Sequence, residues 1–472
     1  MHGCDDAAVV LGEGARLVDA LSGRILEGNG LGAEISREAE VLAALPPGVV
    51  FARTGLDLPS VLRYLGAFRS ARPVALIDPA MPVSALIRLV EWLRPAAVTP
   101  APDGEPPFGY VAKDGHWVRT GGDAAEVHPD LAVLLPTSGS SGRPRLVRLS
   151  RTAILSNARA IAEVLGVSSG DVAPTSLPLH YSYGFSVLNS HLVRGATVVV
   201  EPSSVLGHGF WRTVAEYGCT SLAAVPYHYE VLVRLEFDPS RYPRLRTLTQ
   251  AGGKLRPELV TELDRTMRTA GGRLYVMYGQ TEAAPRMATI PAERLAEKPG
   301  SVGPALPGGR FSIRHNDGSE TTHPKITGEV IYRGPNVMMG YAEDAASLAL
   351  GDETGGVLST GDLGYLDEEG FLFITGRLKR IGRVFGNRIS LDDLEQAVRS
   401  TGLGIDLVAA VPADDKVVLF AEGAAKGVCT AASRALADRL HLHASGFDVR
   451  PIAAIPVLAS GKIDYQTLAE QV

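Results

Sequence analysis

Cysteine is scarce in this chain, which has only Cys4, Cys219 and Cys429 among its 472 residues. An odd number of widely separated cysteines excludes a disulfide framework, provides no metal-ligand spacing and fits a reducing compartment. A strong net charge is also absent, because 46 Lys and Arg stand against 52 Asp and Glu, which leaves a formal charge of −6. We therefore expect no broad attraction to nucleic acid or to an acidic membrane surface.

Long hydrophobic runs are missing as well, since no stretch reaches the roughly 20 apolar residues of a membrane-spanning helix. The first residues, "MHGCDDAAVVLGEG", place acids where a signal peptide would have a basic flank and an apolar run. We expect a cytoplasmic protein without membrane insertion. At 472 residues with 45% hydrophobic side chains, the chain can bury the cores of two to four folding units.

Short β-rich runs alternate with helix-like stretches over the first two thirds of the sequence, a pattern typical of α/β proteins. The β-rich runs are residues 73–78, 131–136, 196–201 and 220–226, and the helix-like stretches are residues 151–166 and 256–271. Ser150 is a suitable N-cap for the first of these helices, while Gly166 and Gly271 are suitable stops for the two.

The pattern of predicted secondary structure changes after about residue 300. Short segments punctuated by Gly and Pro, "GEVIYRGP" and "GFLFITGR", predict a small β-rich subdomain. The basic, glycine-punctuated stretch "GRLKRIGRVFGNR" follows and predicts a hinge, after which fewer than a hundred residues form a small C-terminal domain.

The loop "PTSGSSGRPR", residues 136–145, follows an apolar run and can come close to a ligand. Gly139 and Gly142 tolerate positive φ, and the hydroxyls of Thr137, Ser138, Ser140 and Ser141 beside free N–H groups suit phosphate oxygens. Arg145 adds a fixed charge. The loop lacks the Lys-Ser or Lys-Thr of the G-x-x-x-x-G-K-[ST] motif, so it is either another kind of phosphate loop or a plain turn.

Four further stretches each allow a functional and a plain interpretation. In "YGQTEA", Thr281 can bind a phosphate oxygen and Glu282 a Mg²⁺ ion, or the segment is a strand-ending turn. Asp362 in "STGDLGYLDEEG" can accept ribose hydroxyls or simply form a turn. Arg377 can contact ribose or phosphate or belong to a basic linker, and Lys462 of "SGKID" lies on a loop where most lysines are merely solvated.

Taken in this order and at these distances, the five stretches resemble the adenylate-forming superfamily of acyl-CoA synthetases, peptide-synthetase adenylation domains and luciferases. The resemblance extends from about residue 71 to "GKIDYQTL". It implies an α/β fold whose large N-terminal domain, residues 1–376, contains two α/β subdomains and a small β-barrel subdomain. A hinge at residues 377–380 would join it to a mobile α+β C-terminal domain, residues 381–472.

The resemblance also implies a reaction: a carboxylate is activated with ATP and Mg²⁺ to an acyl-adenylate, pyrophosphate leaves, and the acyl group passes to a thiol such as CoA or phosphopantetheine. Thr281 would contact the α-phosphate, Glu282 the metal ion, and Lys462 both the α-phosphate and the substrate carboxylate, offsetting charge as two anions meet. The remaining ATP or AMP contacts would come from Thr137, Ser138, Gly139, Ser140, Ser141, Gly142, Arg145, Gly252, Gly253, Tyr278, Gly279, Gln280, Asp362 and Arg377.

The sequence departs from the family pattern at several positions without losing a catalytic group. Arg145 stands where Lys is usual, which keeps the charge and changes its shape. The hinge position, most often Asp, is Lys379, followed by Arg380 where a second acid is common. Arg383 also replaces a usual Lys, and the segment before the phosphate loop is short, so we expect a trimmed N-terminal subdomain.

The segment "SLPLHYSYGFSVLNSHL" matches the family's P-L-F-H-x-x-G stretch and would line the acyl pocket together with "VPYHYE". Tyr and His rings with polar edges suit a substituted aromatic acid better than a long alkyl chain, unless these rings only fill the core. The expected pocket residues are His180, Tyr181, Tyr183, Gly184, Tyr227 and His228.

Other functions stay open at this level. Within the class, the chain could load an acyl carrier protein or transfer its adenylate to an amine, including a variant that activates nitrite. From another class, it could be a nucleotide-binding pseudoenzyme, against which the intact Glu282, Asp362 and Lys462 argue. A nucleic-acid role for the basic residues 377–388 lacks interleaved aromatics apart from Phe385.

Overall fold

The computed structural model describes residues 10–122, 124–137, 145–378, 380–458 and 461–472. Within these described ranges, no helix combines the length and the apolar character needed to cross a membrane.

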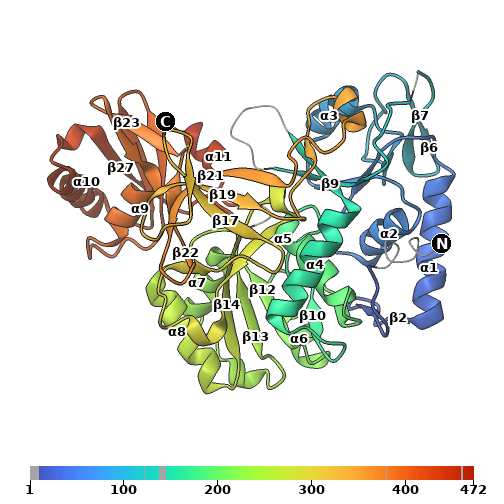
Figure 1. Cartoon of the computed structure of the whole chain (residues 1–472), viewed down its shortest axis with the longest axis horizontal. Coiled ribbons are helices and arrows are strands. Elements are labelled where there is room, and N and C mark those ends of the chain that lie inside the picture. The colour runs from blue at the N-terminus through green and yellow to red at the C-terminus, as the bar shows by residue number, and fades with distance from the viewer. Residues whose placement is uncertain (1–9, 123, 138–144, 379, 459–460) are drawn as a thin grey trace. The chain divides into compact units, whose positions relative to one another are not determined.

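The chain divides into two compact units (Figure 1). The first comprises Met1–Phe311 and Tyr332–Leu358, and the second comprises Ser312–Ile331 and Ser359–Val472. The hinge expected at residues 377–380 falls within the second unit and stays a prediction. Lys379, the expected hinge residue, lies outside the described residues.

A mixed eight-stranded sheet forms one part of the first unit. In the order in which they pair, its strands are β20 (Gly340–Ala342), β9 (Leu146–Ser150), β8 (Leu131–Pro136), β4 (Val74–Ile77), β3 (Val50–Arg53), β5 (Ala97–Thr99), β7 (His116–Arg119) and β6 (Tyr110–Lys113). The four central strands β8, β4, β3 and β5 are parallel, and the outer strands pair antiparallel. The central strands β3, β4 and β5 are largely apolar and, apart from the half-buried Arg53, buried, as expected of parallel strands covered on both faces.

A second sheet of the first unit contains β12 (Ser221–Ala224), β13 (Thr247–Gln250), β14 (Arg273–Gly279) and β15 (Arg286–Thr289), in that order. Its first three strands are parallel, and β15 returns antiparallel to β14. Gln250 and Gly279 therefore end their strands at one edge of the sheet, while Ser221, Thr247 and Arg273 begin theirs at the opposite edge.

The N-terminal segment joins a third sheet of the same unit. Its strands, in pairing order, are β10 (Val172–Pro174), β11 (Thr197–Val200), β1 (Arg16–Asp19) and β2 (Ile25–Glu27). Strand β1 lies parallel to β11, so residues about 180 positions apart in the sequence share one ladder, from Arg16 opposite Thr197 to Asp19 opposite Val200. This pairing carries no local sequence signal.

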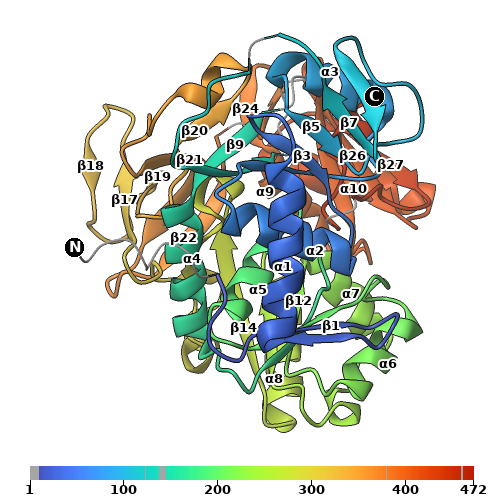
Figure 2. The same ribbon diagram turned by 90° about the vertical axis from the view of Figure 1, so that its right-hand side faces the viewer.

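Helices of the first unit are α1 (Gly28–Ala43), α2 (Leu58–Arg69), α3 (Val83–Leu93), α4 (Arg151–Leu165), α5 (Ser182–Leu192), α6 (His208–Glu216), α7 (Pro226–Arg234) and α8 (Pro257–Thr269). Figure 2 shows α1 and α2 packed side by side, and α4 packs along α5 (Figure 1). Ser150 caps α4 as expected, because its Oγ accepts a hydrogen bond of 3.0 Å from the amide of Ala153. Gly166 ends the helix with φ of +65°.

The second unit begins within a set of β strands. Neighbouring strands of one sheet are β22 (Leu372–Arg377), β21 (Val357–Leu366), β19 (Gly328–Arg333), β17 (Arg310–Arg314) and β18 (Glu320–Thr321). Strands β21 and β22 form an antiparallel hairpin whose last pair joins Asp362 to Arg377. These strands match the β-rich segment expected after residue 300.

The C-terminal residues of the second unit form their own small core. The elements are β23 (Ile381–Val384), β24 (Asn387–Ser390), α9 (Leu391–Arg399), β25 (Val408–Ala413), β26 (Lys416–Glu422), α10 (Lys426–Leu440), β27 (Phe447–Ile452) and α11 (Tyr465–Ala469). Strands β25, β26 and β27 form a sheet, and Leu394, Val408, Leu419 and Leu436 are buried together against it. After Arg380, the rest of the basic stretch forms the hairpin β23–β24.

Candidate active site

Thr281 and Glu282 lie where the sequence pattern places them, directly after β14, on a single 3₁₀ turn (η2, Thr281–Ala283). The Thr281 and Ser182 hydroxyl oxygens are 3.0 Å apart, which joins this turn to the first residue of α5. The backbone of Glu282 is held by Met338, whose amide donates a hydrogen bond of 2.9 Å to the Glu282 carbonyl. The turn is thus fixed through both side chain and main chain.

The Glu282 carboxylate has a partner that the sequence analysis missed. Tyr341, on β20, donates a hydrogen bond of 2.8 Å from its Oη to Oε1 of Glu282. Burial and the neighbouring carboxylate raise the pKa of Tyr341, so the phenol keeps its proton and remains a donor. The Arg145 guanidinium lies 5.5 Å from the centre of the Tyr341 ring, within cation–π range, and its Nε is 3.1 Å from Oε1 of Glu343.

These contacts connect two of the expected phosphate motifs. Arg145 ends the loop predicted to bind pyrophosphate, and Glu282 belongs to the motif predicted to bind metal, yet both contact Tyr341. The Thr137 amide donates to the Arg145 carbonyl at 3.2 Å, so the two ends of the loop are hydrogen-bonded. The remaining expected members, Ser138, Gly139, Ser140, Ser141 and Gly142, lie outside the described residues.

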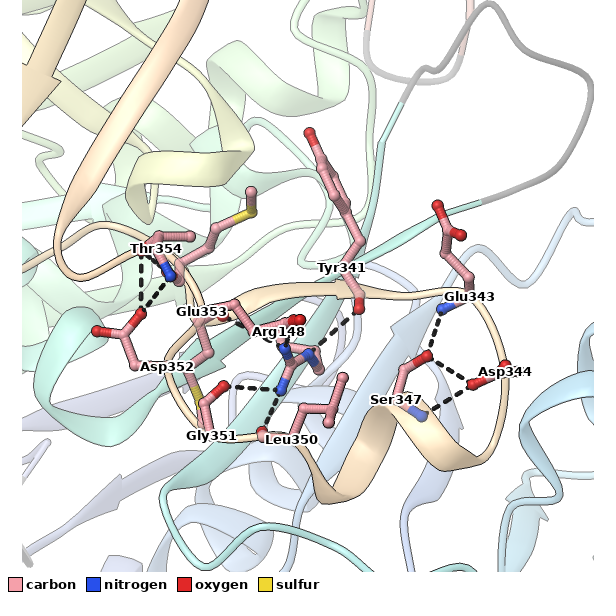
Figure 3. A network of polar contacts seen from close by, with 12 residues as sticks. Arg148, Tyr341, Glu343, Asp344, Ser347, Leu350, Gly351, Asp352, Glu353 and Thr354 are labelled. Carbon is pink, nitrogen blue, oxygen red and sulfur yellow. Dashed lines mark hydrogen bonds and ion pairs between the residues drawn. The ribbon is translucent and has the colours of Figure 1, made fainter.

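Arg148 secures the segment that carries Tyr341. Its buried guanidinium donates to the carbonyl oxygens of Met339 and Tyr341, each at 3.3 Å, and also binds the Leu350 and Gly351 carbonyls (Figure 3). An ion pair with Glu353 balances the charge. Because a buried guanidinium is costly unless its donors and charge are matched, this network stabilises the loop after β20 against β9.

Several of the expected ATP- or AMP-binding residues lie at the carboxyl edge of the second sheet. Gly252 follows β13 with φ of +86°, and the Gln250 side-chain amide donates to the Gly253 carbonyl at 2.7 Å. Tyr278 and Gly279 end β14. A Cβ on Gly279 would overlap the Pro285 carbonyl oxygen, so only glycine allows the strands to approach here. Gln280, the next residue, precedes η2.

The expected acyl-pocket residues occupy the start of α5 and the residues before it. His180 Nδ1 is 3.0 Å from the Thr54 carbonyl oxygen, and burial lowers the pKa of this imidazole. Gly184 has no room for a Cβ, which would overlap the carbonyl oxygens of Leu177 and Pro178. Tyr183 is buried, with its Oη 2.8 Å from the Thr249 carbonyl oxygen, and its ring packs edge-on against Tyr181 at 6.3 Å between centroids.

Tyr227 and His228 lie on the first turn of α7, with ring centroids 6.2 Å apart. Burial lowers the pKa of His228 to about 4, so the imidazole is neutral above that pH. Its Nδ1 is buried and, among the described residues, has no hydrogen-bond partner. A neutral ring with an open polar position next to a tyrosine is suited to contact a polar substituent.

In the second unit, Asp362 and Arg377 form an ion pair with 3.0 Å between Nε and Oδ1. The Asp362 side chain is 4% exposed and that of Arg377 is 62% exposed, so a buried acceptor is paired with a solvent-exposed donor. The Lys462 carbonyl accepts a hydrogen bond of 2.8 Å from the Leu458 amide. The expected residues are therefore divided between the two compact units.

Comparison with known proteins identifies the family to which the chain belongs. The model of a family described as AMP-binding enzyme matches residues 68–342, more than half of the chain. The chain belongs to the family of AMP-binding enzymes. The match contains all the expected phosphate, adenine and acyl-pocket residues of the first unit.

Relatives and a solved structure extend this family assignment. The chain is 34% identical over 269 residues to an oxalate–CoA ligase of Arabidopsis thaliana, covering 56% of this chain and 51% of that protein. It is 30% identical over 351 residues to an indoleacetate–CoA ligase of Aromatoleum aromaticum, covering 72% of this chain and 61% of that protein. The chain thus spans about half to three fifths of these curated relatives.

The structure of O-succinylbenzoate coenzyme A synthetase from Bacillus subtilis, in complex with AMP, superposes with a TM-score of 0.76 at 21% identity. The alignment covers 98% of this chain and 96% of that one. This likeness confirms the expected α/β fold with a large N-terminal and a small C-terminal domain.

The described residues include one oriented carboxylate, Glu282, that suits Mg²⁺. Among them, no group of three or more His, Cys, Asp or Glu side chains could hold a metal ion. Mg²⁺ commonly binds through one or two carboxylates together with substrate phosphates, so a single oriented carboxylate at Glu282 is sufficient on the protein side. Glu282 would be the residue that holds the ion when phosphate is bound.

Proposed function

We propose that this chain activates a carboxylic acid with ATP, releases pyrophosphate and transfers the acyl group from the adenylate to a thiol such as CoA. Membership of the AMP-binding enzymes supports the nucleotide chemistry, and the CoA ligases among its relatives support the thiol acceptor. The single observation that carries the proposal is the connection of Arg145 and Glu282 through Tyr341. The Arg145 guanidinium and the Glu282 carboxylate belong to two different phosphate motifs, and both contact the Tyr341 side chain.

Two displacements make up the proposed reaction. An oxygen of the substrate carboxylate attacks the α-phosphorus of ATP, and the bond to the bridging oxygen breaks as pyrophosphate leaves. The thiolate then attacks the acyl carbon, and AMP leaves with the electron pair of the acyl–oxygen bond. Glu282 would hold a Mg²⁺ ion, which would supply positive charge to neutralise the phosphates.

The chain's own groups have separate roles in this scheme. Thr281 donates to the α-phosphate, Glu282 holds the metal ion, and Asp362 accepts hydrogen bonds from the ribose hydroxyls. Lys462 would contact both the α-phosphate and the substrate carboxylate, where its charge would offset the repulsion of two anions. We propose that the C-terminal domain rotates about Lys379. The rotation would bring one face of this domain to the substrates for adenylation and another face for thiol transfer.

A substituted aromatic acid is the substrate class that we propose. The Tyr181 and Tyr183 rings pack with Tyr227 in one hydrophobic cluster, and His228, whose ring lies beside Tyr227, is neutral and offers a polar edge. The indoleacetate–CoA ligase among the relatives acts on an aromatic acid by its name. Flat apolar faces with polar edges favour such a ring over a flexible alkyl chain.

The experiment is a pyrophosphate-release screen over aromatic, aliphatic and amino acids, with and without CoA, at fixed ATP and Mg²⁺. We expect release with at least one aromatic acid and consumption of the adenylate when CoA is added. If the adenylate reacts only with a carrier-protein thiol or an amine, that group is the acceptor in place of CoA. If nitrite stimulates pyrophosphate release, nitrite is the substrate in place of a carboxylic acid.

Glu282→Ala is the negative control for this screen. The variant should fold, because the carboxylate lies on a turn outside the hydrophobic core, and it should lose pyrophosphate release. ATP binding without release by the wild-type protein for every acid tested would identify a pseudoenzyme.

A further inference from the structure

A cavity of about 380 Å³ lies inside the first unit, lined by α4, α5 and the strands β12, β13 and β14. Much of its wall is polar, including the hydroxyls of Ser186, Ser190, Thr247 and Thr249. Its volume is within the usual range of small-molecule sites. Arg286, the first residue of β15, also lines it and is the one arginine there that is almost fully buried, at 3% exposure.

Arg286 lacks the charge compensation that a buried arginine normally has. Within the described part of the chain, its Nε has no hydrogen-bond partner and no carboxylate forms an ion pair with it. Its guanidinium stacks on the Tyr183 ring at 4.4 Å, and its Nη2 makes one long hydrogen bond of 3.5 Å to Ser186. Arg148, equally buried in the same unit, has Glu353 and several carbonyl oxygens.

This difference points to an absent anion. A buried cation without a counter-ion is strongly unfavourable, and arginine cannot relieve the cost by releasing its proton near neutral pH. Burial lowers the pKa of Arg286, with only tyrosines opposing the shift. The backbone cannot move the side chain away, because Asn157 exchanges two hydrogen bonds with the Arg286 main chain, at 2.7 and 3.1 Å.

The other charged groups of the cavity do not supply the missing anion. Asp171 lines it near the amino-terminal edge of the sheet, but its carboxylate accepts hydrogen bonds from Ser168 and Thr220. Arg246 and Arg273 add positive charge at the same edge. Burial lowers the pKa of His191, so near neutral pH its imidazole adds no charge to the cavity wall.

Helix α5 connects Arg286 with the proposed adenylation site. Its first residue, Ser182, is 3.0 Å from the Thr281 hydroxyl, and Ser186 contacts Arg286 one turn later. Four residues correspond to about 6 Å along the helix axis, and residues four apart lie on the same face. An acid whose reacting carboxylate is near Thr281 and whose body follows α5 therefore brings its far end to Arg286.

We propose that the acid activated by this chain carries a second anionic group, a carboxylate in the simplest case, which Arg286 and Ser186 bind. This inference rests on the proposed function, and it narrows the substrate from aromatic acids in general to acids with a distal negative charge. A bidentate carboxylate contact would satisfy the open Nε and Nη donors of the guanidinium.

The test compares acids that differ only in the distal group. Benzene-1,3- and benzene-1,4-dicarboxylate are paired with 3- and 4-methylbenzoate, and glutarate with pentanoate, so the result does not depend on an aromatic preference. For the wild-type protein, kcat/KM in pyrophosphate release should favour at least one diacid over its partner by about 30-fold or more. Arg286→Met should abolish this preference by lowering kcat/KM for the diacid.

Two further variants and a binding measurement complete the design. Arg159→Met, on the exposed face of α4, removes the same charge outside the cavity and should retain the diacid preference. Arg286→Lys keeps the charge and should retain part of the preference even if the Met variant folds poorly. Without ATP, the preferred diacid should raise the Tm of the wild-type protein and leave that of Arg286→Met unchanged.

Each outcome decides one of the two claims. Equal kcat/KM for diacid and monoacid, or a diacid preference that survives Arg286→Met, would overturn the anion site and leave the proposed function standing. If no acid released pyrophosphate while diacids still stabilised the wild-type protein and not Arg286→Met, the proposed function would be wrong and the anion site correct.

Discussion

Tyr341 donates a hydrogen bond of 2.8 Å to the Glu282 carboxylate across 59 residues of sequence. The contact orients the carboxylate that the proposed reaction needs for its metal ion. The same tyrosine ring lies 5.5 Å from the Arg145 guanidinium, so one side chain positions groups from two phosphate motifs. Tyr341 is therefore a positioning residue in the proposed site.

The first prediction concerns this hydrogen bond. Tyr341→Phe should require more Mg²⁺ for half-maximal pyrophosphate release and should lower kcat/KM by about tenfold, since hydrogen bonds to charged groups contribute roughly 1.5–3 kcal/mol. A Mg²⁺ titration of the initial rate measures both effects. Tyr217→Phe, at the end of α6, is the matched control and should behave as the wild-type protein. An unchanged Mg²⁺ dependence would mean that Tyr341 does not orient Glu282.

The second prediction concerns the ion pair between Asp362 and Arg377. Asp362→Asn removes the charge but keeps the shape of the side chain, so ribose hydroxyls lose charge-assisted acceptors. We expect the Kd for ATP to rise by about tenfold or more, with a smaller effect on the KM of the acid. Equilibrium binding of an ATP analogue checks this.

The third prediction is a pH dependence of stability caused by His228. Its pKa is lowered to about 4 by burial, below the value of about 6.5 expected in the unfolded chain. Between these values the unfolded state binds more protons, so the free energy of unfolding should fall as the pH is lowered from about 6.5 to 4. The difference between the pKa values of His228 in the unfolded and folded states corresponds to a loss of roughly 3 kcal/mol in the free energy of unfolding.

Urea unfolding at several pH values measures this effect. His180 and His191 are also buried with lowered pKa values, so the contribution of His228 is the difference between wild-type protein and His228→Gln. The variant should show a flatter pH profile below pH 6.5. Identical profiles would show that His228 is protonated in the folded protein as readily as in the unfolded chain.

The fourth prediction separates the two half-reactions. Lys462→Ala should abolish adenylate formation but still convert supplied acyl-adenylate and thiol to product, because its charge acts only while two anions meet. Lys379→Pro, which fixes φ near −65°, should form adenylate and fail in transfer if rotation at this residue is needed. Both half-reactions are measured on both variants. Loss of the same step in both would contradict a domain rotation about Lys379.

Local physical chemistry made several features readable from the sequence. Ser150 and Gly166 limit α4 because capping hydroxyls and left-handed glycines act on their nearest backbone neighbours. The ends of β13 and β14 place Gly252 and Tyr278 at one edge because parallel strands share direction. The motif residues themselves could be named because each stretch is contiguous and ordered along the chain.

Long-range geometry decided the rest. Nothing near Tyr341 or Arg148 in the sequence indicates that β20 pairs with β9, about 190 residues away, or that the Arg148 charge is balanced by Glu353. The isolation of Arg286 is likewise invisible in "AAPRMA", because the absence of a counter-ion depends on every side chain that packing brings near it. The sequence determined which groups are present and which turns hold them, whereas only tertiary packing decided which charges are compensated and which one is left facing a cavity.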